Sequence, residues 1–113
     1  MQTTISTAEL KAKIDSGADD FVLVDTMRAE SYIARHVPTA KNITEGIDFV
    51  QNYAAETAAP KDKQVIVYCS SETCERHRRA ADALEAAGYT NVARYEEGLA
   101  GWQNAGLAFE SSQ

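Results

Sequence analysis

Two short runs of apolar residues most constrain the fold of this chain. Residues 21–25 read FVLVD and residues 65–69 read VIVYC, so nearly every side chain in each run is apolar. A strand with one face in water alternates apolar and polar residues, whereas a continuous apolar run is typical of a strand buried on both faces, usually in a parallel sheet. Each run ends in a chemically useful residue, Asp25 in the first and Cys69 in the second.

Helical patterns lie between the predicted strands. Ser6 and Glu9 have the spacing of a capping box, and Gly17 provides a stop, which predicts a helix over residues 5–14. The alternation of strands and helices predicts an α/β fold with a central, mostly parallel β-sheet flanked by α-helices on both faces. We further expect helices over 28–36, from a cap at Thr44, from the turn after Cys69 to Gly88, and over 98–106, with strands over 40–43 and 91–95.

Length and charge limit the classes of function. The chain has 113 residues, and we expect one domain over residues 1–113 and a monomer. Its 11 basic and 17 acidic residues give a formal net charge of -6, which argues against nucleic acid and anionic membranes as partners. No apolar run approaches the ~18 residues of a membrane span, and no signal-peptide pattern opens the sequence. A cytoplasmic location with reduced thiols is therefore expected.

Both cysteines of the chain lie in one predicted strand-to-helix turn. Ligands of parallel sheets gather at the carboxyl ends of the strands, so Asp25 and Cys69 are expected to share one rim. Backbone N–H groups of the turn SSETC and the following helix N-terminus would favour a thiolate, lowering the pKa of a thiol from about 8.5. A buried small hydrophobe is the alternative role of Cys69. The CxxxxC spacing, with only His36 and His77 besides, does not match the usual zinc pattern, and a redox CxxC is absent, so no metal or cofactor is expected.

Three stretches, in order, resemble the single-domain rhodanese-like family of sulfurtransferases over residues 5–109. VIVYC is similar to the strand that presents the family's cysteine, and RRAADALEAAGYTNVARYEEGLAGWQNAGL is similar to the family's carboxyl-terminal segment. LVDTMRAESYIARHVPTAKNI is similar to the first signature and matches it at Asp25, Glu30, Tyr32, His36, Pro38, Ala40, Asn42 and Ile43.

The resemblance implies a rhodanese-like fold and a catalytic nucleophile at Cys69. This cysteine would accept sulfane sulfur from thiosulfate or a small-molecule or protein persulfide, and pass it to a thiol acceptor. Asp25 and His36 would be supporting residues that brace the fold. Cys74 is either a resolving thiol that attacks Cys69 or an inward-packed cysteine at the helix start, and the sequence leaves a disulfide between them open. The implied anion-binding loop consists of Ser70, Ser71, Glu72, Thr73 and Cys74. Arg76 is added as a substrate-binding residue because, of the basic residues at the start of the following helix, it is nearest this loop.

The cysteine loop departs from the common family pattern. The family loop resembles CRxGxR or CRxGxT, whereas this chain has CSSETC, a variant with a CxxxxC loop and without a basic residue. Glu72 should repel doubly negative thiosulfate, so we expect weak thiosulfate turnover. A non-catalytic binding or redox-sensing module using Cys69 and Cys74 is the first alternative. An arsenate reductase or phosphatase is a weaker one, because its CxxxxxR pattern would put arginine where this chain has Glu75.

Overall fold

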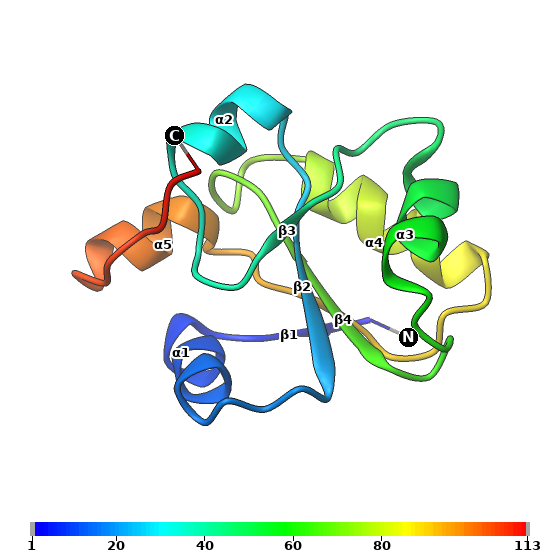
Figure 1. The fold of residues 1–113 in the computed structure, drawn as a ribbon, viewed down its shortest axis with the longest axis horizontal. Coiled ribbons are helices and arrows are strands. Elements are labelled where there is room, and N and C mark those ends of the chain that lie inside the picture. Colours follow the sequence, from blue (N-terminus) through cyan, green and yellow to red (C-terminus); the bar gives the residue numbers. More distant parts are fainter. Residues whose placement is uncertain (1, 113) are drawn as a thin grey trace.

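In the computed structural model, which describes residues 2–112, strands and helices alternate along the chain (Figure 1). The five strands form one sheet in the order β1-β5-β4-β2-β3, and every neighbouring pair is parallel. This confirms the predicted α/β class. Within residues 2–112, no helix has the length and apolar character needed to cross a membrane. The elements are β1 (Thr3–Thr4), α1 (Thr7–Asp15), β2 (Phe21–Asp25), α2 (Ala29–Ala34), β3 (Lys41–Asn42), α3 (Phe49–Thr57), β4 (Gln64–Tyr68), α4 (Arg76–Ala86), β5 (Val92–Arg94) and α5 (Gly98–Asn104).

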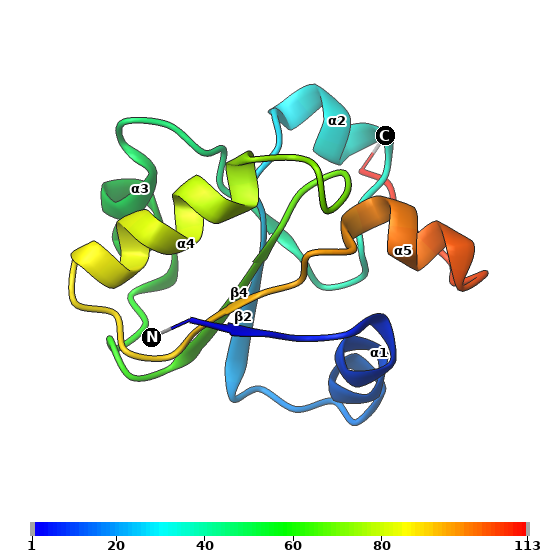
Figure 2. The same ribbon diagram turned by 180° about the vertical axis from the view of Figure 1, so that it is seen from behind.

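Helices cover both faces of the sheet. Helices α1 and α5 lie on one side of the strands, and α3 and α4 lie on the other (Figures 1 and 2). Side chains of the central strand β4 alternate between the two cores: Ile66 belongs to the cluster that contains Trp102 of α5, and Val67 to the cluster that contains Leu84 of α4. Because successive side chains of a strand point to opposite faces and both faces are covered, residues 65–68 of β4 are all buried and apolar, as the sequence pattern indicates.

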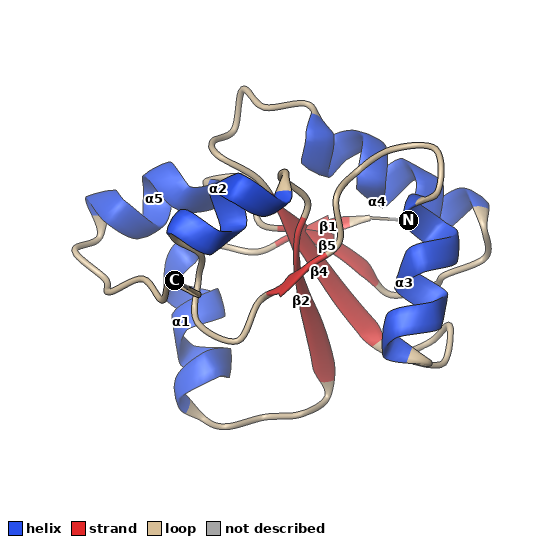
Figure 3. Ribbon diagram, turned by 45° about the horizontal axis from the view of Figure 1, so that its top comes forward, coloured by secondary structure: helices blue, strands red, loops and turns tan. Residues whose placement is uncertain are grey.

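The carboxyl ends of β2 and β4 lie side by side. These strands pair along their full length, with Asp25 opposite Tyr68, so the residue after Tyr68 emerges at the same rim as Asp25. That residue is Cys69. The red strands of Figure 3 show this fan of parallel strands, which are joined through helices. The topology thus places the two strand-end residues on one rim, as the sequence predicts.

The local capping predictions have mixed outcomes. The Ser6 hydroxyl accepts the Glu9 N–H at 3.1 Å, and the Glu9 carboxylate accepts the Ser6 N–H at 3.0 Å, which confirms the capping box. The predicted cap at Thr44 is wrong, because α3 begins only at Phe49. The Thr44 hydroxyl donates instead to the backbone carbonyl of Met27 at 2.9 Å. The hydroxyl that could cap a helix is therefore used by the Met27 carbonyl, a contact distant in the sequence that residue spacing does not reveal.

Strand β1 was not predicted from the sequence. It consists of Thr3 and Thr4, both exposed, and it pairs with β5 at the edge of the sheet. Two exposed residues carry no apolar periodicity, so this strand exists because the edge of β5 offers backbone partners.

Candidate functional site

Cys69 follows the last residue of β4 and is fully buried. The first turn of α5 holds it in place: the N–H of Leu99 donates to the Cys69 carbonyl at 3.1 Å, and the N–H of Ala100 donates to the Ser70 carbonyl at 2.9 Å. Gly98 permits this close approach, because its φ is +59° and an added Cβ would collide with the Cys69 carbonyl oxygen. The N–H groups of the first turn of α5, which have no partner within that helix, thus fix the start of the cysteine loop, residues 69–74.

The cysteine loop keeps several backbone donors free. In a trans peptide the N–H points opposite to the preceding C=O, so the N–H groups of Ser70 and Ser71 point away from α5. Within the described chain, none of the N–H groups of residues 70–73 donates a hydrogen bond. The Cys74 N–H is used, because it donates to the Ser71 carbonyl at 3.1 Å. Four consecutive amides of the loop are therefore available to an anion.

Cys69 and Cys74 are joined by a disulfide. Their Cα atoms are 6.4 Å apart, within the usual range for such a bond. Cys74 is partly exposed, whereas Cys69 is not exposed at all. The loop thus brings the two thiols into bonding distance, the question that the sequence left open, and α4 begins two residues later at Arg76.

His77 is the third member of this group. Its side chain is fully buried, and its Nδ1 lies 3.1 Å from the Cys69 Sγ. Its Nε2 is buried without a hydrogen-bond partner among the described residues. Burial is the main reason that the pKa of His77 is lowered, and the nearby Arg78 and Arg94 lower it further. A neutral imidazole therefore stands against the sulfur at neutral pH.

From the sequence, His77 was considered only as a possible zinc ligand and was given no role in the site. A signal was present: His77 lies three residues before Ala80 and seven before Leu84, which are buried on the same face of α4. The helical period separates this histidine from the exposed Arg78 and Arg79 beside it.

The basic residues at the start of α4 differ in what they contact. Arg78 pairs with Glu96 at 3.0 Å, and Arg79 pairs with Glu45 at 3.1 Å. Arg76 is partly buried, and its side chain makes no hydrogen bond or ion pair with any residue in the range 2–112. Of these three arginines, Arg76 is the one whose charge is not already paired with a carboxylate.

A pocket of about 340 Å³ lies between the cysteine loop and α5. Two carboxylates, those of Glu72 and Glu97, belong to its lining, and no basic side chain does. A small anion would meet repulsion here, whereas a group with an ammonium would be attracted. The complete lining is Ser71, Glu72, Thr73, Glu97, Ala100, Gly101 and Asn104.

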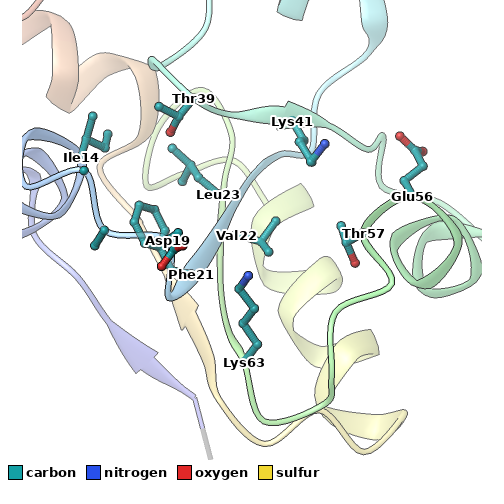
Figure 4. Close-up of a pocket in the computed structure, with 12 residues that line it drawn as sticks. Ile14, Asp19, Phe21, Val22, Leu23, Thr39, Lys41, Glu56, Thr57 and Lys63 are labelled. Atoms are coloured by element: carbon teal, nitrogen blue, oxygen red, sulfur yellow. The ribbon is translucent and has the colours of Figure 1, made fainter.

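A second pocket, of about 500 Å³, lies at the opposite end of the sheet. Figure 4 shows its lining around the start of β2, with Phe21, Val22 and Leu23 beside Lys63, which directly precedes β4. These are the amino ends of the strands, whereas Cys69 follows a carboxyl end. Neither Cys69 nor any other residue of the cysteine loop lines this pocket, so we do not assign the chemistry to it.

Asp25 braces the rim. One carboxylate oxygen accepts the Met27 N–H at 2.9 Å, and the other accepts the Tyr68 hydroxyl at 2.8 Å. The same hydroxyl accepts the Val37 N–H at 3.1 Å, so one buried network joins β2, β4 and the segment before β3. Burial raises the pKa of Asp25, against the opposing effect of these hydrogen bonds. Its contacts are those of a structural residue.

His36 is also held by structural contacts. Its Nδ1 lies 2.8 Å from the Tyr32 carbonyl, and its ring stacks on that of Tyr32 with centroids 3.8 Å apart. Its Nε2 lies 3.9 Å from a carboxylate oxygen of Glu110, and the backbones of these two residues form an antiparallel bridge. His36 therefore fastens the carboxyl-terminal segment to the fold.

The site group also matches a metal-ligand set in part. One ring nitrogen of His77 and the sulfurs of Cys69 and Cys74 all lie within 4.8 Å of one another. A metal ion binds cysteine as the thiolate, and in the disulfide neither Cys69 nor Cys74 is a thiolate. After reduction the group would present two thiolates and one imidazole, one ligand fewer than a closed tetrahedral zinc site requires.

Comparisons with known proteins agree on the fold. A search of curated proteins found no match. A protein from Bacillus halodurans has a TM-score of 0.86 and 24% identity, covering 97% of this chain and 77% of that one. A thiosulfate sulfurtransferase from Pseudomonas aeruginosa has a TM-score of 0.80 and 26% identity, covering 99% of this chain but 21% of that one. A protein of unknown function from Rhodopseudomonas palustris, described as a possible tyrosine phosphatase, has a TM-score of 0.76 and 27% identity, covering 96% and 84%.

The sequence match is to one family and covers most of the chain. The family model of the rhodanese-like domain matches residues 6–105. These residues include both cysteines, His77 and every strand of the sheet except β1. The chain therefore belongs to the rhodanese-like domain family.

Proposed function

We propose that this protein is a sulfurtransferase that carries sulfane sulfur as a persulfide on Cys69. The observation that supports it most is the position of Cys69 at the carboxyl rim, with His77 Nδ1 3.1 Å from its sulfur. The Cys69 thiolate attacks the sulfane sulfur of a donor, the donor leaves as a thiolate, and an acceptor thiolate then takes the outer sulfur from Cys69.

The free amides of residues 70–73 support the binding of the persulfide anion. A negative charge in a closed site needs hydrogen-bond donors that are already in place. These amides form no other hydrogen bond within residues 2–112, and α5 fixes the first two of them by holding the carbonyls of Cys69 and Ser70. The loop residues thus serve as the anion-binding segment, and Arg76 adds an unpaired positive charge nearby.

The donor we propose is an organic persulfide, of a small molecule or a protein, and the acceptor is a thiol. Glu72 and Glu97 line the pocket beside the loop, and Arg78 is already paired with Glu96. Thiosulfate carries two negative charges and would approach two carboxylates, whereas cysteine persulfide also has an ammonium group that these carboxylates attract.

The alternatives to a sulfurtransferase are a redox-sensing module and a phosphatase or arsenate reductase. The Cys69–Cys74 disulfide favours a redox-sensing module as the second candidate, since such a module needs no sulfur donor. Phosphatase or arsenate reductase chemistry is not proposed, because Glu75 occupies the position of the oxyanion-binding arginine and lies 3.6 Å from Arg78. An acidic residue there would repel an oxyanion.

Intact-mass measurement tests the proposal. Reduced protein is incubated with cysteine persulfide, and small molecules are then removed. The Cys74→Ser variant should gain one sulfur atom, and the Cys69→Ser variant should gain none. A sulfur adduct that survives Cys69→Ser, or no adduct with either cysteine persulfide or thiosulfate, would overturn the proposal and leave the redox-sensing module.

A further inference from the structure

We propose that Cys74 and His77 give this site a second activity, the reductive release of the bound sulfur as hydrogen sulfide, which ends in the Cys69–Cys74 disulfide. This inference rests on the proposed persulfide on Cys69. It assigns a chemical role to the second thiol, which a simple transfer cycle between donor and acceptor does not require, and it extends the role of the buried histidine to that thiol.

The first support is the pairing of the sulfurs. Cys74 lies five residues after Cys69 on a loop that brings its sulfur into bonding distance of the Cys69 sulfur. The Cys69 sulfur is the inner atom of the proposed persulfide. A thiolate that attacks the inner atom expels the outer sulfur, whereas an external acceptor that attacks the outer atom carries it away. The loop therefore places Cys74 where it can attack the inner sulfur and release the outer one, rather than carry the outer sulfur away.

The second support is the contact set of His77. Its Nδ1 is 3.1 Å from the Cys69 sulfur, and one of its ring nitrogens lies with both cysteine sulfurs in a group of atoms within 4.8 Å of one another. A histidine kept only for structure would be expected to satisfy both nitrogens, yet Nε2 is buried without a partner in the described chain. A base beside two thiols can take the proton of whichever sulfur is about to attack.

The proposed reaction balances over two steps. In the first, the proton of the Cys69 thiol moves to His77, the thiolate attacks the sulfane sulfur of RS–SH, and RS⁻ leaves and takes the proton as RSH. In the second, the Cys74 proton moves to His77, the Cys74 thiolate attacks the inner sulfur of Cys69–S–SH, and HS⁻ leaves and takes the proton as H₂S. The sum is RSSH plus two protein thiols giving RSH, H₂S and the protein disulfide. The outer sulfur is reduced and the two cysteine sulfurs are oxidised.

The cycle closes with an external dithiol as reductant. It attacks the protein disulfide, becomes a disulfide itself, and returns Cys69 and Cys74 to thiols. The structure corresponds to the product of the second step. The reductant belongs to the class of small-molecule or protein dithiols.

A single-turnover experiment tests the release step. Reduced protein, freed of small thiols and kept without oxygen, receives one equivalent of cysteine persulfide. Released sulfide is measured, and the protein is alkylated and its intact mass is determined by mass spectrometry. The native protein should release close to one sulfide per chain and become an unalkylated disulfide. Cys74→Ser should keep the added sulfur and release at least tenfold less sulfide until dithiothreitol is added, and Cys69→Ser should neither gain sulfur nor release sulfide.

The outcomes separate this inference from the proposed function. If the native protein keeps the sulfur, leaves Cys74 open to alkylation and releases sulfide no faster than Cys74→Ser, the release activity is wrong while the persulfide on Cys69 stands. If Cys74→Ser gains no sulfur, the proposed function fails first. A disulfide formed without a matching amount of sulfide would also overturn the release step.

The role of His77 has its own readout. In the reduced protein, the rate at which iodoacetamide alkylates Cys69 reports the thiolate as pH is varied, and Cys74→Ser isolates that one thiol. His77→Gln in this background should move the alkylation midpoint toward the ~8.5 of a free thiol. The charged groups near His77 are Glu75 and Arg78 of the α4 region, and Arg94 and Glu96 of the β5 region. An unchanged midpoint in His77→Gln would remove the histidine from the mechanism.

Discussion

Two buried histidines of this molecule have opposite surroundings. His36 bonds through Nδ1 to the Tyr32 carbonyl, stacks on the Tyr32 ring and places Nε2 near Glu110. His77 has a sulfur at Nδ1 and no partner at Nε2 within residues 2–112. A buried polar group is normally satisfied, so the unpaired Nε2 of His77, in the first turn of α4 beside two cysteines, supports the chemical role that we propose for it. We call these regions the His36 corner and the His77 corner.

The largest expected effect separates the two corners by rate. His77→Gln should slow the reaction of Cys69 with cysteine persulfide by roughly 100-fold or more at pH 7, because general-base assistance contributes about that much. His36→Gln should leave the rate within about threefold and lower the free energy of unfolding by roughly 2 kcal/mol, since it loses stacking and a buried hydrogen bond. Single-turnover kinetics and urea unfolding check both variants. Equal rates in His77→Gln and His36→Gln would contradict a chemical role that only His77 has.

The next effect compares two glycines of the α5 region: Gly98, the first residue of α5, and Gly106, two residues after the end of α5. Gly98→Ala should lower the free energy of unfolding by roughly 3 kcal/mol, because a left-handed φ and a collision with the Cys69 carbonyl act together. Gly106→Ala is the matched control: its φ is +74°, but nothing lies within 4 Å of the added Cβ. It should cost roughly 1 kcal/mol, from backbone strain alone. Comparable losses in urea unfolding would mean that α5 does not fix the cysteine loop.

A smaller effect follows reduction of the disulfide. Because the closed loop is short, with a sequence separation of five, its removal should lower the free energy of unfolding by about 2 kcal/mol or less. Urea unfolding of native protein with and without dithiothreitol measures this difference, and Cys74→Ser should show none between the two conditions. A fall in the native protein that exceeds about 4 kcal/mol would show that the disulfide, rather than the packed cores, holds the His77 corner together.

The smallest effect is the pH dependence of stability in the oxidised protein. The folded pKa of His77 is lowered, chiefly by burial, so below the unfolded pKa of about 6.5 the unfolded chain binds more protons. Stability should therefore fall as pH drops through this value, and His77→Gln should remove that contribution. Unfolding series from pH 7.5 to 5.5 compare the two proteins. Identical slopes would contradict the lowered pKa.

The sequence predicts the sheet well and the site in part. Strands β2 and β4 contain continuous apolar runs because helices cover both faces of the sheet. A short stretch of sequence therefore indicates how the whole sheet is packed. Cys69 and Asp25 were found because strand ends are visible in sequence. His77 was overlooked because three charged neighbours hid its face, although its spacing to Ala80 and Leu84 placed it inside. The Thr44 cap failed because a residue distant in sequence, Met27, uses that hydroxyl.

The two cysteines of the disulfide differ in exposure, which bears on the order in which they would react. In the disulfide Cys69 is fully buried, whereas Cys74 is partly exposed. In the proposed cycle, an incoming thiolate should therefore attack Cys74 first, form a mixed disulfide there and release Cys69 as the leaving thiolate, next to His77. Under the proposed function, a persulfide donor therefore meets no thiolate on Cys69 while the disulfide is intact. The oxidised protein should be inactive toward such a donor until a thiol has opened the disulfide at Cys74.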